Sequence, residues 1–162
     1  MVFETYDRTI EAIVLKRLVY DLDLLVNGEK ERLNKLPIKF MYKKKDEEAV
    51  RQGLQYNDEV RAKNLQPVKQ RDKRFKIDTR ELAFARQNRI PIRVTLRGGE
   101  VFTGTIDWYS HFEIKMSLGE DASVVVFRHA AYDFALVGAQ MPPHRGPARR
   151  GGGRDRRPPR RS

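Results

Sequence analysis

The sequence predicts a mainly β protein of the α+β class, in which one helix precedes a bent antiparallel sheet of five short strands. Three observations lead to this prediction: a helix-capping pattern after residue 76, apolar alternation with a period of two from residue 90 onward, and glycines where strands turn or bend. We expect this unit over 77–138, after a small α/β region of unknown role over 1–67 and a basic linker over 68–76, and before a disordered tail over 139–162.

The N-terminal region predicts a mixture of helix and strand. The segment AIVLKRLVYDL at 12–22 satisfies the helical and the strand period in part, and we favour a helix. YDLDLLVNGEK then predicts a strand that ends in an Asn27-Gly28 turn, a dipeptide typical of tight hairpins. A second strand is expected in LPIKFMYKKK at 36–45, and a short helix in DEEAVRQGL. Because NKLPIKFMY echoes NRIPIRVTL further along the chain, a degenerate duplicated module is an open alternative.

A helix is expected over 78–88. Asp78 followed by Glu81 forms a capping box, in which the first side chain satisfies free amides of the opening turn and the second reaches back to the cap. The helix must end before Pro91, because proline lacks an N–H and disfavours helical geometry in the residue before it.

Five short strands are expected after the helix. Gly98 and Gly99 permit a tight reversal after the first strand, and Gly104 inside the second allows a sharp bend. The expected strands are IPIRVTLR, VFTGTIDWY, HFEIKMSL, SVVVFRHA and YDFALV. Because five strands are too few to close a barrel without edges, we expect open edges that pair with neighbouring subunits.

Composition excludes several classes of protein. The chain has no cysteine, so disulfides, thiolate zinc sites and cysteine nucleophiles are excluded. Its three histidines do not predict a metal site, and neither a phosphate-binding glycine loop nor a nucleophile elbow occurs. No apolar run approaches the roughly 18 residues of a membrane-spanning helix, and MVFETYDRT does not resemble a signal peptide. We therefore expect a cytoplasmic binding protein that is not an enzyme, needs no cofactor and does not enter a membrane.

Positive charge is concentrated at the C-terminal end of the chain. The formal net charge is +11, and residues 142–162 hold eight arginines against one acid, Asp155. This tail is rich in glycine and proline and has almost nothing apolar to bury, so it should remain disordered. Because arginines attract phosphates through counterion release, nucleic acid is the expected partner. A tail that only keeps the protein soluble is the alternative.

Two motifs after the helix carry a family resemblance. The first is NRIPIRVTLRGGEVFTGTIDWYSHFEIKM, with a turn glycine at Gly99 and a mid-strand glycine at Gly104, and the second is the segment FRHA that begins at Phe127. Together they make residues 78–137 similar to the bacterial Hfq-like RNA chaperones of the Sm/LSm family. The resemblance implies the Sm-like fold, which is an N-terminal helix followed by a five-stranded bent antiparallel sheet.

The resemblance also implies a ligand and an assembly. Proteins of this type bind single-stranded, U-rich RNA and promote RNA–RNA pairing in post-transcriptional regulation. Six subunits form a homohexameric ring by pairing strand edges, with the cation and the histidine of the second motif in the central pore. Phe112 would stack on uracil, and Arg128 would contact phosphates or uracil edges. The candidate RNA-binding residues are His111, Phe112, Arg128 and His129 in the pore, and Arg86 and Arg89 on the rim.

Each candidate also has a structural interpretation. His129 can be a satisfied structural histidine, Phe112 a core aromatic, and the two helix arginines ordinary solvated charges. Arg128 can pair with an acid such as Asp107 or Asp133 inside the fold. For the protein as a whole, the alternative function is a ring that serves as a scaffold for a protein partner, docked through the N-terminal region, with incidental nucleic-acid contact.

Overall fold

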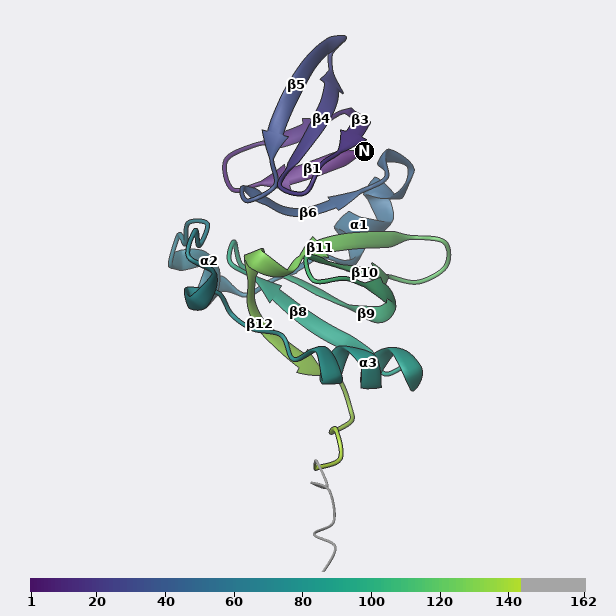
Figure 1. Cartoon of the computed structure of the whole chain (residues 1–162). Helices are drawn as coiled ribbons and strands as arrows, with labels where there is room; N and C mark the ends of the chain where they lie inside the picture. Colours follow the sequence, from purple (N-terminus) through teal and green to yellow (C-terminus); the bar gives the residue numbers. More distant parts are fainter. Residues whose placement is uncertain (144–162) are drawn as a thin grey trace, which may run out of the picture.

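Strands dominate the structure, a computed structural model that describes residues 1–143 (Figure 1). Those of the first half are β1 (Val2–Thr5), β2 (Thr9–Glu11), β3 (Ile13–Arg17), β4 (Asp21–Val26), β5 (Glu29–Asn34), β6 (Ile38–Tyr42) and β7 (Gln55–Tyr56). Those of the second half are β8 (Ile92–Leu96), β9 (Glu100–Tyr109), β10 (Glu113–Ser117), β11 (Ser123–Phe127) and β12 (Ala131–Leu136). The short helices are η1 (Lys44–Asp46), α1 (Glu47–Gly53), α2 (Asp58–Ala62), η2 (Arg71–Lys73), α3 (Thr79–Gln87) and η3 (Arg128–Ala130).

The strands form two antiparallel sheets. The larger has nine strands in the order β12-β8-β9-β10-β11-β6-β1-β2, with β7 paired to β9, and the smaller has the order β3-β4-β5. Figure 1 shows the smaller sheet at the top and α3 at the bottom of the view. No helix in the described part of the chain is long and apolar enough to cross a membrane. Most of the expected disordered tail falls on residues 144–162, which lie outside the described residues.

The helix expected over 78–88 is confirmed as α3. Asp78 precedes it in an extended conformation, and its Oδ1 accepts a hydrogen bond from the Arg80 backbone N–H (2.8 Å), which satisfies a free amide of the first turn. The apolar side of the helix is buried and packs on β9. The helix ends at Gln87, before Pro91, as proline chemistry requires.

The five strands expected after the helix are all present, and two glycines shape them. Gly99 has a φ of +90°, which the tight turn between β8 and β9 requires. At Gly104, the carbonyl oxygen of Ser117 on β10 approaches so closely that a Cβ would overlap it. A side chain at position 104 would therefore push β10 away from β9.

The expected fold class is nevertheless wrong, because these five strands are not a sheet of their own. β11 pairs with β6, with Val125 opposite Met41 and Val126 opposite Phe40, and through β6 the sheet continues to β1 and β2. The chain is therefore not a helix and a five-stranded sheet preceded by a separate α/β region. Local sequence patterns do not show this, because a strand edge carries no mark of the distant strand that will pair with it.

The helix expected over 12–22 is also wrong. These residues form β3 and the start of β4. Leu15 and Val19, which are four residues apart and support the helical period in the sequence, are both exposed in the structure, so no helical apolar stripe is buried here. The other N-terminal predictions are confirmed: the Asn-Gly turn between β4 and β5 has positive φ at both residues, β6 lies within 36–45, and α1 is the short helix.

When β2 and β3, which only Ala12 separates, are counted as one strand that passes from one sheet to the other, the same strand order occurs twice along the chain. In the C-terminal strand set (β8 to β12), the last strand β12 pairs with the first, β8, and β9, β10 and β11 follow side by side. In the N-terminal strand set (β1 to β6), the last strand β6 pairs with the first, β1, and β1 pairs with β2. Only Ala12 separates β2 from β3, and β3, β4 and β5 then lie side by side in the smaller sheet. The echo that suggested a duplication relates β6 to β8, which hold different positions in the two sets, so it does not describe this repeat.

The pair of β6 and β11 joins the two sets and divides the core into two clusters. Successive residues of a strand point to opposite faces of the sheet. Phe40 and Val126 accordingly belong to the cluster that also contains the buried residues of α3 and β8, whereas Met41 and Val125 belong to the cluster of the N-terminal strand set. Burial on both faces explains why β11 contains an unbroken apolar run from Val124 to Phe127.

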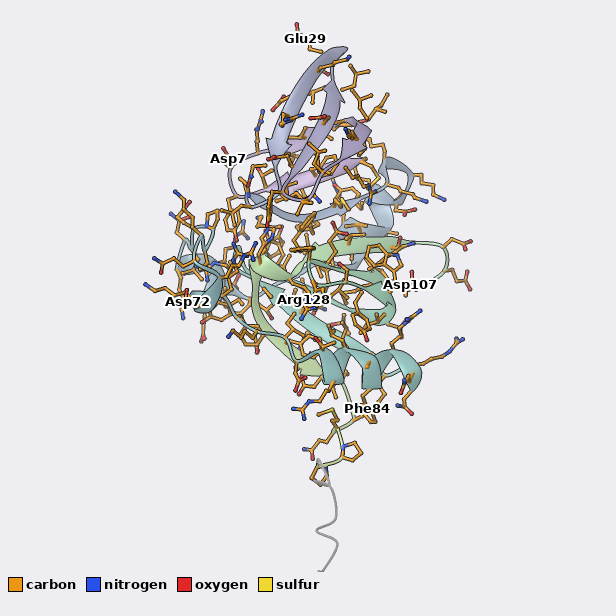
Figure 2. The ribbon with its side chains drawn as sticks, viewed as in Figure 1. Asp7, Glu29, Asp72, Phe84, Asp107 and Arg128 are labelled. Atoms are coloured by element: carbon orange, nitrogen blue, oxygen red, sulfur yellow. The ribbon has the colours of Figure 1, made fainter. Side chains whose placement is uncertain are left out.

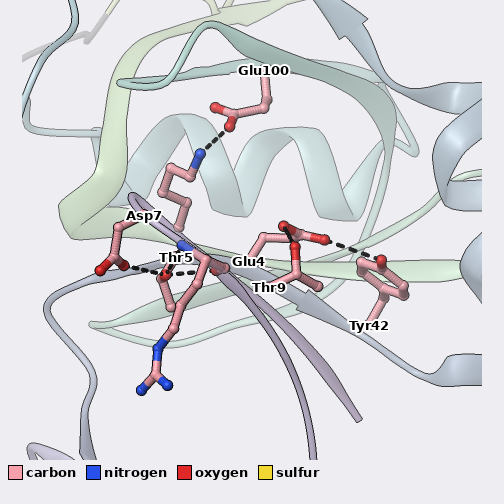
Figure 3. A network of polar contacts seen from close by, with 8 residues as sticks. Glu4, Thr5, Asp7, Thr9, Tyr42 and Glu100 are labelled. Carbon is pink, nitrogen blue, oxygen red and sulfur yellow. Dashed lines mark hydrogen bonds and ion pairs between the residues drawn. The ribbon is translucent and has the colours of Figure 1, made fainter.

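A network of polar contacts, partly buried, lies beside this junction (Figure 3). Lys39 on β6 forms an ion pair with Glu100 on β9, and little of either side chain is exposed. Glu4 accepts hydrogen bonds from the Thr9 hydroxyl (2.7 Å) and from the Tyr42 hydroxyl (3.3 Å). The two strand sets are therefore joined by a buried pair of charges as well as by apolar packing.

Candidate nucleic-acid interface

Arg128 begins η3, the helical turn between β11 and β12, and lies near the centre of the molecule in Figure 2. Its Nη1 donates to the carbonyl oxygen of Ser110 (2.7 Å) and its Nη2 to that of Ile77 (2.9 Å). Burial lowers the pKa of the guanidinium from its ordinary value. Within the described residues no carboxylate forms an ion pair with Arg128, so pairing with Asp107 or Asp133 is not observed.

His129 connects η3 to the N-terminal strand set. Its Nε2 lies 3.0 Å from the carbonyl oxygen of Ile38 on β6, and its ring lies 5.3 Å from that of Phe127, measured between centroids. Burial, assisted by the positive charge of Arg74, lowers the pKa of the imidazole to about 4. The ring is therefore neutral at pH 7, and its Nε2–H donates to Ile38.

Phe112 occupies the turn between β9 and β10, directly after His111. It is 47% exposed, so it is not a core residue. Its backbone N–H donates to the hydroxyl of Ser110 (3.1 Å), and its carbonyl oxygen accepts from the backbone N–H of Arg128 (2.8 Å). These bonds hold the phenyl ring at the surface, in a defined place next to η3.

A cavity of about 500 Å³ brings these residues together with a second group of cations. Its lining residues are Arg71, Arg74, Phe75, Lys76, Ile77, His111, Phe112, Arg128 and His129. None of these lining residues is a carboxylate, so the cavity wall combines two aromatic rings with positive charge. Positive charge beside exposed aromatic rings is the typical composition of a site for single-stranded nucleic acid.

The segment 71–77 supplies one wall of this cavity. Arg74 holds the preceding loop in a compact turn, because its Nε donates to the carbonyl oxygen of Val68 (2.9 Å) and its Nη2 to that of Lys69 (3.2 Å). Phe75 lines the cavity and is 41% exposed. The sequence identified this stretch only as a basic linker. The signal that points to its individual residues is an aromatic placed among cations in RDKRFK.

Arg86 and Arg89, the two candidates at the end of α3, do not line the cavity. Arg86 Nε donates to the carbonyl oxygen of Asp107 (3.1 Å), and Arg89 has a φ of +51° just after the helix. The structure therefore brings together four of the six candidate residues, those of the second motif and of the β9–β10 turn.

The cavity offers ring faces, positive charge and few other functional groups. Nowhere in residues 1–143 do three or more His, Asp or Glu side chains form a group that could hold a metal ion. No family model, no curated protein and no solved structure matches the chain. The similarity to Hfq-like RNA chaperones therefore rests on the two sequence motifs.

Proposed function

We propose that the protein binds single-stranded RNA in the cavity between η3, the β9–β10 turn and the segment 71–77. The observation that supports this most strongly is the exposure of Phe75 and Phe112 in a cavity that several cations line and no carboxylate does. Bases of an unpaired strand stack on aromatic rings, and cations attract the phosphates between them. A duplex keeps its bases stacked on one another and gains nothing from these rings.

The lining residues divide into those that contact RNA and those that shape the cavity. Phe112 supplies the main stacking surface, while Arg71 and Lys76 supply charge for phosphates. In this proposal Arg128 has a different role from the expected one, because each of its terminal nitrogens already donates one hydrogen bond to a backbone carbonyl oxygen. It adds positive charge and holds the β9–β10 turn in place. His129 is neutral and acts through its hydrogen bond to β6.

U-rich RNA is the ligand class that the two sequence motifs favour. A protein that holds such a strand unpaired, and whose arginine-rich tail attracts a second strand, can promote RNA–RNA pairing in post-transcriptional regulation. A cytoplasmic location accompanies this proposal. The tail binds phosphates without regard to base sequence, so base preference has to come from the cavity.

Ring assembly belongs to the same proposal, in a form adapted to the strand order. The ring implied by the resemblance pairs strand edges of neighbouring subunits, but β6 of the same chain already occupies the edge of β11. In the described residues β5 pairs only with β4, and β12 only with β8. We propose that β5 of one molecule pairs with β12 of the next, as β11 pairs with β6. Because each chain supplies two strand sets, three chains complete a ring of six sets.

A protein-binding scaffold is the second candidate function. It is favoured by the exposed apolar residues Ile13 and Leu15 on β3, since exposed apolar side chains on a strand often mark a contact with another protein. A partner of this kind would dock on the N-terminal strand set. RNA contact would then be incidental.

Titration of labelled oligo(U), oligo(A) and duplex RNA with the wild type and with Phe112→Ala tests the proposal. Loss of the Phe112 phenyl ring should weaken oligo(U) binding by about 1–3 kcal/mol per stacked base. The melting temperature should hardly change, because Phe112 is exposed. Tyr56→Ala is the matched control, since Tyr56 is 49% exposed and lies outside the cavity. Equal binding of duplex and single strand, or no effect of Phe112→Ala, would favour the scaffold.

A further inference from the structure

A second cavity, of about 270 Å³, adjoins the first and extends toward the N-terminal strand set. The two share Arg71, Arg74, Phe112 and His129 in their walls, so they lie next to each other, and we refer to them together as the groove. From the N-terminal strand set, the second cavity adds Val19, Tyr20, Lys35 and Leu36. As in the first cavity, no carboxylate is among its lining residues.

Tyr20 presents an aromatic ring at the far end of this groove. It is 57% exposed, which is more than Phe112 or Phe75. The hydroxyl of Tyr20 accepts a hydrogen bond from Arg71 Nη2 (3.1 Å), and the guanidinium carbon of Arg71 lies 5.8 Å from the ring centroid. Arg71 therefore contacts Tyr20 in the second cavity and also lines the first cavity.

The turn that carries Tyr20 is held in place by Lys35. The backbone N–H of Lys35 donates to the carbonyl oxygen of Tyr20 (2.8 Å), and its Nζ donates to that of Leu18 (2.6 Å). A third bond, from Leu18 N–H to the carbonyl oxygen of Asp21 (2.9 Å), closes the turn. The ring is thus exposed on a turn whose backbone bonds are satisfied, and stacking on it requires little ordering of the backbone.

We propose that Tyr20, with Arg71, forms a second base-stacking subsite, so that the RNA strand runs from Phe112 across the junction onto the N-terminal strand set. This inference rests on the proposed function and adds the path that the ligand follows. Stacking on the Tyr20 ring does not depend on base identity, because every base has a flat face. Arg71 lines the groove between the two subsites and attracts phosphates of the strand as it passes there.

The subsite makes affinity depend on the length of the ligand. We expect a trinucleotide of uridine to be held at Phe112 within the first cavity, and a dodecanucleotide to extend to Tyr20 as well. In anisotropy titrations at one salt concentration, Tyr20→Ala should lower the affinity for the dodecanucleotide by about 5- to 150-fold. This range corresponds to the stacking of one base. The affinity of Tyr20→Ala for the trinucleotide should stay within about twofold of the wild-type value. Phe112→Ala should weaken both ligands.

Two further variants separate stacking from other effects. Tyr20→Phe keeps the ring and loses the hydrogen bond from Arg71, so it should retain most of the affinity for the dodecanucleotide. Tyr56→Ala is the matched control, because Tyr56 is also an exposed tyrosine with an arginine, Arg61, whose guanidinium carbon lies 4.5 Å from the ring centroid. Tyr56 lines neither part of the groove, and its removal should change neither affinity.

The outcomes distinguish the inference from the proposed function. If Phe112→Ala weakens both ligands and Tyr20→Ala weakens neither, the strand does not reach Tyr20, and the second subsite is refuted while RNA binding in the first cavity stands. If the wild type binds neither oligonucleotide, both proposals fail together. If Tyr20→Ala and Tyr20→Phe weaken the dodecanucleotide equally, the hydrogen bond and not the ring is responsible, and the stacking subsite is overturned.

Discussion

His129 and Ile38 meet across the junction of the two strand sets, with His129 Nε2 3.0 Å from the Ile38 carbonyl oxygen. His129 follows β11 and Ile38 begins β6, so this hydrogen bond continues the pairing of the two strands by one side-chain contact. The same imidazole lines both parts of the groove. One residue thus connects the stability of the junction to the shape of the proposed RNA site.

Stability should fall when His129 takes up a proton. Its pKa is about 4 in the folded protein and about 6.5 in an unfolded chain, so between these values the unfolded state binds more protons. The stabilisation is fully present above pH 6.5 and is lost as the pH falls toward 4, by an amount on the order of 3 kcal/mol. Urea denaturation at several pH values measures it.

Two glutamine variants provide the comparison for this pH dependence. His129→Gln can still donate to Ile38 but does not titrate, so the difference in stability between pH 7 and pH 4 should become smaller. His111→Gln changes an exposed histidine of the neighbouring turn and should leave the dependence as in the wild type. An identical pH dependence in wild type and His129→Gln would contradict the prediction.

Arg128→Ala should lower both stability and RNA affinity. The change removes two donors from the carbonyl oxygens of Ser110 and Ile77 and frees the β9–β10 turn, which should cost about 1–3 kcal/mol. Affinity falls as well, because a cation is lost and Phe112 is less well positioned. Thermal melting and oligo(U) titration of the same preparation measure both effects. Lower stability with unchanged affinity per folded molecule would exclude Arg128 from the RNA site.

The protein should lose less stability when both Lys39 and Glu100 are replaced than when Lys39 alone is replaced. Lys39→Met leaves a buried carboxylate without its cation and should cost about 3–5 kcal/mol of unfolding free energy. Adding Glu100→Leu should recover most of this loss, because no charge then remains buried. Chemical denaturation of the three proteins provides the measurement.

A matched control for this pair is the exposed bridge between Arg32 and Asp23 on the smaller sheet. Arg32→Met should change stability little, because solvent already screens both charges. If Lys39→Met is as mild as Arg32→Met, the buried pair does not hold the junction together.

The proposed ring can be trapped with a chemical cross-link. The chain has no cysteine, so Lys30→Cys on β5 and Asp133→Cys on β12 introduce the only two thiols. A flexible bis-maleimide should cross-link the double variant into species of two and three chains and no larger ones. Light scattering of the wild type should give the mass of three chains. Single variants should give no species beyond a dimer. A monomer at micromolar concentration would rule out the assembly.

Deletion of residues 142–162 should weaken RNA binding for all sequences and flatten its dependence on salt. We expect the eight arginines of this segment to contact phosphates, and each such contact would contribute about −0.7 to the slope of log affinity against log salt concentration for a single strand. Titrations at several salt concentrations with and without the tail measure the slope. An unchanged slope would assign the tail a solubilising role only.

The sequence alone determined the elements that depend on neighbouring residues. Asp78 and Pro91 set the limits of α3, because capping and the missing proline N–H act within one or two turns. The Asn27-Gly28 hairpin was predictable for the same reason, since asparagine and glycine adopt positive φ more readily than other residues do. Four of the six candidate residues line one cavity, and two short motifs contain them; that they bind RNA stays a prediction.

The way in which these elements join depends on packing between distant parts of the chain. The apolar alternation of β11 and β6 is compatible with many partners, and the choice depends on complementary edges and on two cores that both strands bury together. The groove follows from that choice, because it brings Tyr20 of the N-terminal strand set to Phe112 of the C-terminal set. Contacts between residues so distant in the chain leave no local pattern, since the free energy that selects them comes from packing of the whole sheet.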